Sequence, residues 1–216
     1  MAPQQRPTLA PISLERRELT RHNTFEFWSR KLGRAVVLLG PTQFDAALLL
    51  EFNRDVLSYC ERPAMQLDLL PEGSGRSRAL DFWVERRNGH QVGILVFEAN
   101  RHISEDLLRR SLDAAGLRWE VWLAADLAKR RQLIRNLKQL RPYVSSDEPE
   151  IEAVEQQVSE FLSQYRGGRW DQLQAAAAST TPGRFTRTIA RMYHDGRVDL
   201  DLETLPLSKR TWVKAL

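Results

Sequence analysis

The sequence predicts an α/β protein, and three observations along its 216 residues lead to this prediction. A β-hairpin pattern lies in the middle of the chain, around Asn88-Gly89. A helix rich in alanine and leucine precedes the hairpin, and segments that alternate between strand and helix patterns follow it. The acidic, proline-containing segment SSDEPE then separates a small, mainly helical C-terminal part.

The composition fits a globular protein and permits nucleic-acid binding. Hydrophobic residues make up 42% of the chain, which is ordinary for a protein with a core. The net charge of +4 permits contact with nucleic acid without requiring it. The single cysteine, Cys60, excludes an internal disulfide and suits a reducing compartment. The sequence shows no signal-peptide pattern and no apolar run long enough to cross a bilayer, so we expect a soluble, cytoplasmic protein without membrane contact.

The N-terminal residues 1–24 are expected to form an extended, basic arm, because they contain three prolines and several arginines. Within this arm, the segment LERRELTRH indicates a short helix. A basic arm can lie along DNA phosphates, and it can equally be only solvated.

The next elements are a short strand and a core helix. The strand is expected over Ala35–Leu39, where valine and leucine dominate. Gly40-Pro41-Thr42 interrupts this strand and starts a helix over residues 43–51, with Thr42 as the expected N-cap. The helix is apolar almost all round, which is typical of a core helix. The segment VLSYCERPAMQLDLL that follows is expected to be extended.

The central hairpin carries the first candidate site. We expect strands over Leu80–Arg86 and Val92–Phe97, joined by a type I′ turn at Asn88-Gly89. Asp81 lies at the entry of this hairpin and Glu98 at its exit, so strand pairing is expected to bring the two carboxylates close together. Close acids repel each other unless a cation lies between them, and Mg²⁺ prefers carboxylate oxygens. The hairpin therefore predicts either a Mg²⁺ site or a core hairpin with two solvated acidic ends.

A basic amphipathic helix follows further along the chain. Residues 104–116 indicate a helix, and LRWEVWLA alternates like a half-buried strand. The segment DLAKRRQLIRNLKQLRPY then predicts one helix with an apolar face and a basic face. Its candidate contacts to DNA phosphates are Arg130, Arg131, Arg135 and Lys138. A basic face that is only solvated is the alternative.

The C-terminal part has the outline of a winged helix. Three helix patterns, IEAVEQQVSEFLSQY, RWDQLQAAAAST and RFTRTIARMYHDG, precede two short strand-like pieces around a turn. Arg184, Arg187 and Arg191 recur along the third helix, which in a DNA-binding winged helix would enter the major groove. A protein-binding surface is an equally good interpretation. His194 lies beside a turn and is expected on the surface.

Two long segments resemble the N-terminal domain of TnsA, the endonuclease subunit of heteromeric bacterial transposases. They are FWSRKLGRAVVLLGPTQFDAALLLEFNRDVLSYCERPAMQLDL and ALDFWVERRNGHQVGILVFEAN. The positions that match the family pattern are Ser29, Lys31, Gly33, Arg34, Leu49, Leu50, Glu51, Phe52, Asp55, Val56, Ser58, Tyr59, Pro63, Asp81, Phe82 and Glu98. The segment GRVDLDLETLPLSKRTWV also resembles the end of the family's C-terminal winged-helix domain.

The resemblance implies a restriction-endonuclease-like domain over residues 25–145, followed by a small winged-helix-like domain over residues 150–216. In that family a helix Glu, the strand Asp and a Glu or Gln of the last strand hold the metal, and a nearby Lys stabilises the attacked phosphate. In this sequence the strand acids are Asp81 and Glu98, the helix position falls on Gln43, and the Lys position falls on Asn100. Glu51, on the same helix as Gln43, is expected to be a capping or surface acid.

Three functions remain open at this point. The resemblance implies a subunit that binds transposon-end DNA, a TnsB-like transposase and a TnsC-like ATPase, takes no small-molecule substrate, and cleaves 5′ ends with Mg²⁺ if its site is active. A catalytically inactive, architectural TnsA-like subunit is the alternative that Gln43 and Asn100 favour. A stand-alone DNA-binding or restriction-type protein with the same fold is the third.

Overall fold

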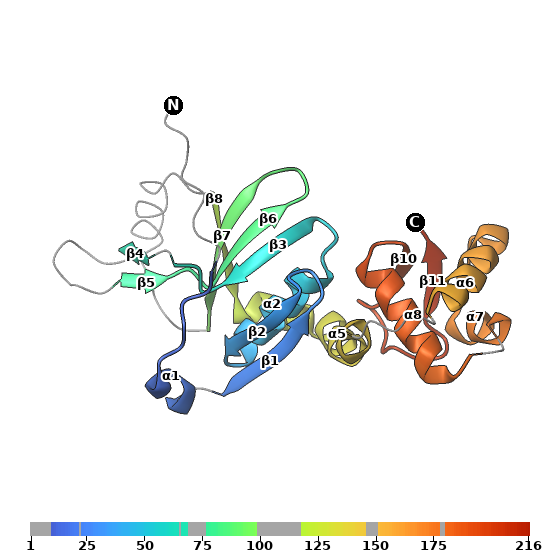
Figure 1. Cartoon of the computed structure of the whole chain (residues 1–216), viewed down its shortest axis with the longest axis horizontal. Coiled ribbons are helices and arrows are strands. Elements are labelled where there is room, and N and C mark those ends of the chain that lie inside the picture. Colours follow the sequence, from blue (N-terminus) through green and yellow to red (C-terminus); the bar gives the residue numbers. More distant parts are fainter. Residues whose placement is uncertain are drawn as a thin grey trace. The chain divides into compact units, whose positions relative to one another are not determined.

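The computed structural model of the protein describes residues 10–21, 23–64, 66–68, 77–98, 118–145, 151–177 and 180–216 (Figure 1). The protein is mixed α/β, as the sequence predicts. The chain forms two compact units: unit 1 comprises Met1–Leu50 and Asp55–Lys129, and unit 2 comprises Glu51–Arg54 and Arg130–Leu216. The domain limits given above stay a prediction, and the predicted helix over residues 104–116 lies outside the described residues.

Unit 1 is built around a mixed four-stranded sheet. Its described elements are α1 (Arg16–Arg21), β1 (Thr24–Ser29), β2 (Arg34–Leu39), most of α2 (Pro41–Phe52), β3 (Val56–Glu61), β4 (Gln66–Asp68), β5 (Ser77–Ala79), β6 (Phe82–Arg86), β7 (Gln91–Phe97), β8 (Arg118–Leu123) and α4 (Ala124–Lys129). The sheet has the order β3-β6-β7-β8, in which only β7 and β8 run parallel. The strands β1 and β2 form a separate antiparallel ribbon, as do β4 and β5 (Figure 1).

The predicted central hairpin is confirmed as β6 and β7, with Phe82 opposite Ile94. The predicted type I′ turn is wrong, because in this loop only Gly89 has a positive φ, of 78°. The Gly89 N–H donates to Arg86 O over 2.9 Å, and the Arg86 N–H donates to His90 O over 2.8 Å. The connection is therefore a three-residue loop in which glycine alone takes the left-handed conformation.

The predicted strand and core helix of unit 1 are confirmed as β2 and α2, and Ala46, Ala47 and Leu48 are fully buried. The helix begins at Pro41, so Thr42 lies inside its first turn and the predicted N-cap is wrong. Proline suits the first helical position because its missing N–H has no partner there anyway. Strand β1 was not predicted, although its residues alternate between exposed and buried positions.

Unit 2 combines helices with a small sheet. Its elements are α5 (Arg131–Val144), α6 (Ile151–Tyr165), β9 (Gly167–Arg169), α7 (Trp170–Ala176), α8 (Pro182–His194), β10 (Val198–Leu200) and β11 (Trp212–Ala215), together with the last residues of α2. Strand β11 lies between β10 and β9, and all three are antiparallel. The three C-terminal helices and the two terminal strands are as predicted. Strand β9 was missed because Gly-Gly-Arg has little strand propensity.

The single basic helix predicted over residues 126–143 is wrong, because the chain turns at Arg130 and forms the two helices α4 and α5. Arg130 has φ −95° and ψ 18°, outside the helical range. Helix α5 packs its apolar face on α8, which also contacts α6 and β10. Among the described residues, no helix is long and apolar enough to cross a bilayer.

Candidate functional site

Asp81 is a buried acid at the start of β6. It lies between Leu80 and Phe82, which are fully buried, and its own exposure is 7%. A carboxylate in such a place needs hydrogen-bond donors to offset its lost hydration. The Val96 N–H of β7 donates to Asp81 Oδ2 over 2.7 Å, and this bond fixes the side chain against the neighbouring strand.

Gln43, in the first turn of α2, supplies a second donor to Asp81. Its Nε2 donates to Asp81 Oδ1 over 2.6 Å, and its Oε1 accepts from the Leu39 N–H over 3.0 Å. These two contacts determine the orientation of the amide. If the amide were flipped, its NH₂ would face the Leu39 N–H and its oxygen would face the Asp81 carboxylate, and neither contact could be a hydrogen bond. The structure thus brings together the helix position and the strand position that the sequence singled out.

Glu98 and Asn100 complete the predicted set of four residues. Glu98 is exposed and directly follows β7, two positions beyond Val96. Asn100 lies outside the described residues. Within the described ranges, no group of three or more His, Cys, Asp or Glu residues is placed to hold a metal ion.

The donors around Asp81 decide how well this place suits Mg²⁺. Mg²⁺ prefers about six oxygen ligands in regular octahedral geometry. Here each oxygen of the Asp81 carboxylate accepts a hydrogen bond from an N–H group, and Gln43 presents its NH₂ to the carboxylate. An ion at Oδ1 would have to displace that donor. The residues as arranged therefore do not fit a resident Mg²⁺.

Lys31 and Arg34, two residues on which the predicted resemblance depends, have structural contacts. Lys31 Nζ donates to Leu50 O over 2.9 Å, which ties the β1–β2 ribbon to α2. The Arg34 guanidinium donates to both oxygens of Glu61, over 2.7 and 2.6 Å, and Glu61 is only 2% exposed. A bidentate pair of this kind is strong and geometrically specific. The Arg34–Glu61 pair therefore holds β2 to β3.

A buried ionic cluster in unit 2 corrects two predictions. Glu51 was expected to be a capping or surface acid and His194 to lie on the surface, but their exposures are 2% and 7%. His194 Nε2 lies 2.9 Å from Glu51 Oε1, and His194 Nδ1 lies 3.0 Å from Asp195 Oδ1. Burial alone lowers the pKa of His194, but the hydrogen bonds with Asp195 and Glu51 outweigh it, so that the pKa is raised. The two nitrogens face opposite ways, so the cluster does not converge on a metal position.

The predicted phosphate contacts on α5 are exposed. Arg131, Arg135 and Lys138 follow one another at helical spacing on one side of α5, and we name them the basic face of α5. Arg130, just before the helix, is also exposed and lies 3.4 Å from Glu203. The opposite side of α5 is buried within unit 2.

The predicted arginines on α8 differ in exposure. Arg184 is exposed, Arg187 is half-buried, and Arg191 is buried with 6% exposure. The cause is the packing of α8 against α5, α6 and β10, which leaves little of the helix open to solvent. Arg191 therefore does not reach a DNA groove in this arrangement of unit 2.

No protein-family model matches the chain, and no curated protein matches it either.

Proposed function

We propose that the protein is a TnsA-like subunit of a heteromeric transposition system that binds transposon-end DNA and a transposase without cutting the DNA itself. The hydrogen bond from Gln43 to Asp81 carries this proposal. It supports the family assignment, and it also argues against a working metal site.

The family assignment is supported because the two aligned positions meet in space. Gln43 and Asp81 are 38 residues apart, and the family pattern alone identified them as two parts of one site. Their side chains lie 2.6 Å apart, as two positions of one site should. The mixed sheet beside α2 is compatible with a restriction-endonuclease-like domain.

The non-cleaving role is supported by the chemistry of the same pair. A neutral amide that donates to Asp81 replaces the acid that would share a metal ion with it. Loss of such charge stabilisation at a reacting phosphate costs about two to three orders of magnitude in rate. We therefore place the role of the protein in assembly on DNA rather than in strand cleavage.

The mode of DNA binding follows from unit 2. Its element order α6, β9, α7, α8, β10, β11 supports a winged-helix-like unit. Because α5 covers α8, we propose that the basic face of α5 contacts the DNA backbone in place of a recognition helix. Arg184, exposed at the start of α8, can add a contact at one end.

The test is a cleavage and binding assay with the full chain, its cognate transposase and transposon-end DNA, in Mg²⁺ and in Mn²⁺. We expect wild type and Asp81→Ala to form the same transposase-dependent complex and to leave the 5′ strand intact. The variant Arg131→Ala/Arg135→Ala/Lys138→Ala should lose most of its DNA affinity. Cleavage of the 5′ strand that Asp81→Ala abolishes would show instead that the protein is an active endonuclease, and absence of both DNA and transposase binding would refute the TnsA-like role.

A further inference from the structure

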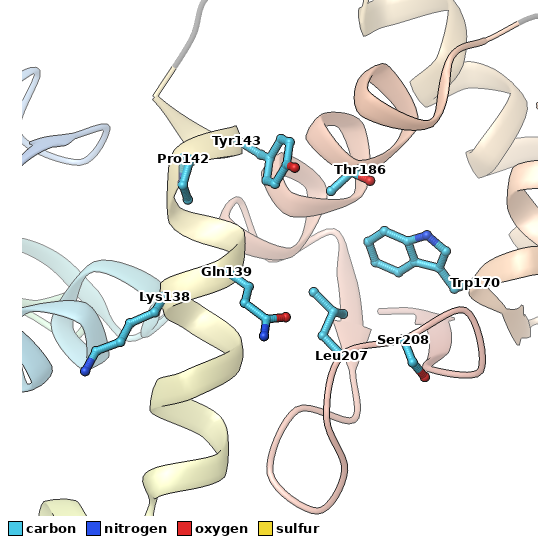
Figure 2. A pocket seen from close by; sticks show the side chains of 8 residues that line it. All are labelled: Lys138, Gln139, Pro142, Tyr143, Trp170, Thr186, Leu207 and Ser208. Carbon is cyan, nitrogen blue, oxygen red and sulfur yellow. The ribbon is translucent and has the colours of Figure 1, made fainter.

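Unit 2 contains an open pocket of about 460 Å³ whose lining residues, Lys138 apart, take no part in the contacts described above (Figure 2). Helix α5, the start of α7, helix α8 and the segment between β10 and β11 form its walls. The lining residues are Lys138, Gln139, Pro142, Tyr143, Trp170, Thr186, Leu207 and Ser208.

One wall of the pocket is held in place by a buried asparagine. Asn136 of α5 is fully buried, and its Nδ2 donates to Leu202 O and to Leu205 O, each over 2.8 Å. Its Oδ1 accepts from the Leu207 N–H over 2.9 Å. The Asn136 side chain therefore holds the backbone of the segment after β10 at three residues, and the third of these, Leu207, lines the pocket. The wall exists before any ligand binds, which lowers the entropic cost of binding.

The part of the wall that Trp170 forms is also fixed. The Trp170 ring packs edge to face on Phe185, with ring centres 5.5 Å apart and an angle of 85° between the planes. Its exposure is only 6%, so the indole has little freedom. Next to Leu207, the Ser208 N–H donates to Thr211 Oγ1 over 2.9 Å.

The lining chemistry selects a neutral, planar ligand. No carboxylate or imidazole is among the described lining residues, which disfavours a metal ion. Lys138 supplies the charge in this lining, and Figure 2 shows its side chain pointing away from the space that Gln139 faces. A small free anion would therefore find no cationic side chain inside the pocket. Aromatic and aliphatic walls with an amide and hydroxyls suit a ring that carries hydrogen-bonding edges.

We infer that this pocket binds a nucleobase that has left the DNA stack. The inference rests on the proposed DNA binding, because the basic face of α5 lies on the helix that lines the pocket. Lys138 belongs to the basic face of α5 and also contributes to the lining, so a strand whose phosphates lie along that face would pass the rim of the pocket beside Gln139 and Tyr143. The Gln139 amide offers one donor side and one acceptor side, as adenine recognition by Gln requires. Unpaired bases are the cheapest to extract from a duplex.

The test compares three DNAs of one sequence with the full chain, by fluorescence anisotropy at fixed salt: a duplex with a single bulged adenine, the same duplex with an abasic bulge, and the fully paired duplex. We expect the bulged adenine to be bound about tenfold more tightly than the abasic bulge, as for one base–aromatic contact. Gln139→Ala and Tyr143→Ala should remove this preference. Gln156→Ala, at an exposed glutamine of α6, is the matched control and should keep it. Lys138→Ala should weaken binding of all three DNAs alike.

Equal affinity for the bulged and abasic duplexes would overturn the inference and leave DNA binding intact. A titration with deoxyadenosine monophosphate, followed by the NMR signal of the Trp170 indole N–H, separates the two proposals. A shift of that signal that Gln139→Ala reduces supports the pocket even if no duplex binds. The inference would be refuted if the Trp170 signal does not shift and the bulged adenine is not preferred. Binding of a peptide, but of no nucleotide, in this pocket would also refute it.

Discussion

At His194, two carboxylates decide the charge of a buried ring. A neutral imidazole has one N–H, yet both ring nitrogens lie within 3.0 Å of a carboxylate oxygen. Only the doubly protonated ring can donate to both. The pairing explains why the pKa is raised although burial opposes it. The contact with Glu51 also connects α8 to the last turn of α2 within unit 2.

This pairing predicts a pH-dependent stability. The folded pKa of His194 is raised above its unfolded value of about 6.5, so the stabilisation is fully present below that value and is lost as pH rises through the folded pKa. We expect the free energy of unfolding, measured by urea denaturation, to fall as pH rises above neutral. His194→Gln should flatten that part of the profile. An unchanged slope in the variant would show that other groups cause it.

Gln43→Glu tests the site of unit 1 at the scale of a single residue. The substitution places a second carboxylate about 2.6 Å from Asp81, so the two acids repel and a divalent cation between them becomes favourable. We expect a lower Tm without metal and a Tm that rises when Mn²⁺ is added, by differential scanning fluorimetry. The double variant Gln43→Glu/Asp81→Asn lacks the acid pair and should not respond. Equal responses in both variants would contradict this account.

At the scale of elements, a glycine sets how closely β9 approaches the core of unit 2. Gly168 is buried, and a Cβ there would come within 2.8 Å of both Leu173 Cδ1 and Phe161 Cε1. The same strand pairs with β11, so its position fixes one edge of the sheet. Gly183, in the first turn of α8, has no atom within 4 Å of a Cβ.

These two glycines form a matched pair of substitutions. Gly168→Ala should destabilise the protein by about 1–3 kcal/mol, because the core must move to accept the methyl group. Gly183→Ala should be neutral or slightly stabilising, since alanine favours the helix and meets no neighbour. Chemical denaturation measures both. A destabilisation by Gly183→Ala as large as that by Gly168→Ala would show that packing at β9 is not the cause.

At the scale of the whole molecule, the net charge of +4 is small, so the distribution of charge matters more than its sum. The basic face of α5 places three exposed cations along one helix, whereas several arginines elsewhere in unit 2 lie in ion pairs or are buried. Arg169 pairs with Asp171, and Arg197 pairs with Glu155. The basic face of α5 is therefore a surface on which a phosphate backbone would meet three cations.

The salt dependence of DNA binding tests this assignment. Removal of one cation that binds a phosphate should reduce the slope of log affinity against log salt by about 0.9. We expect Arg131→Ala/Arg135→Ala/Lys138→Ala to lower the slope by up to about 2.7 on that basis. The control Arg118→Ala/Arg166→Ala/Arg210→Ala removes the same charge from exposed positions elsewhere and should leave the slope nearly unchanged. Equal reductions in both would mean that binding follows net charge alone.

The sequence by itself determined the elements whose signals are local. Alternation and the Asn88-Gly89 turn residues located the central hairpin, although not its loop type. Continuous apolar runs identified α2 as a core helix, and punctuation by proline and glycine separated the C-terminal helices. These signals act over a few residues, where backbone propensity and periodic burial dominate.

Only the tertiary structure decided which distant side chains meet. Glu51 and His194 are 143 residues apart, and nothing in either neighbourhood shows that a partner exists. Helix α5 packs on α8, and Arg191 is buried in α8. Both facts likewise depend on packing between whole helices. Gln43 and Asp81 fall between these cases, because the family pattern placed both at one site while the direction of their hydrogen bond came from the fold. Such contacts are set by the burial of surfaces far apart in the chain, which no local pattern encodes.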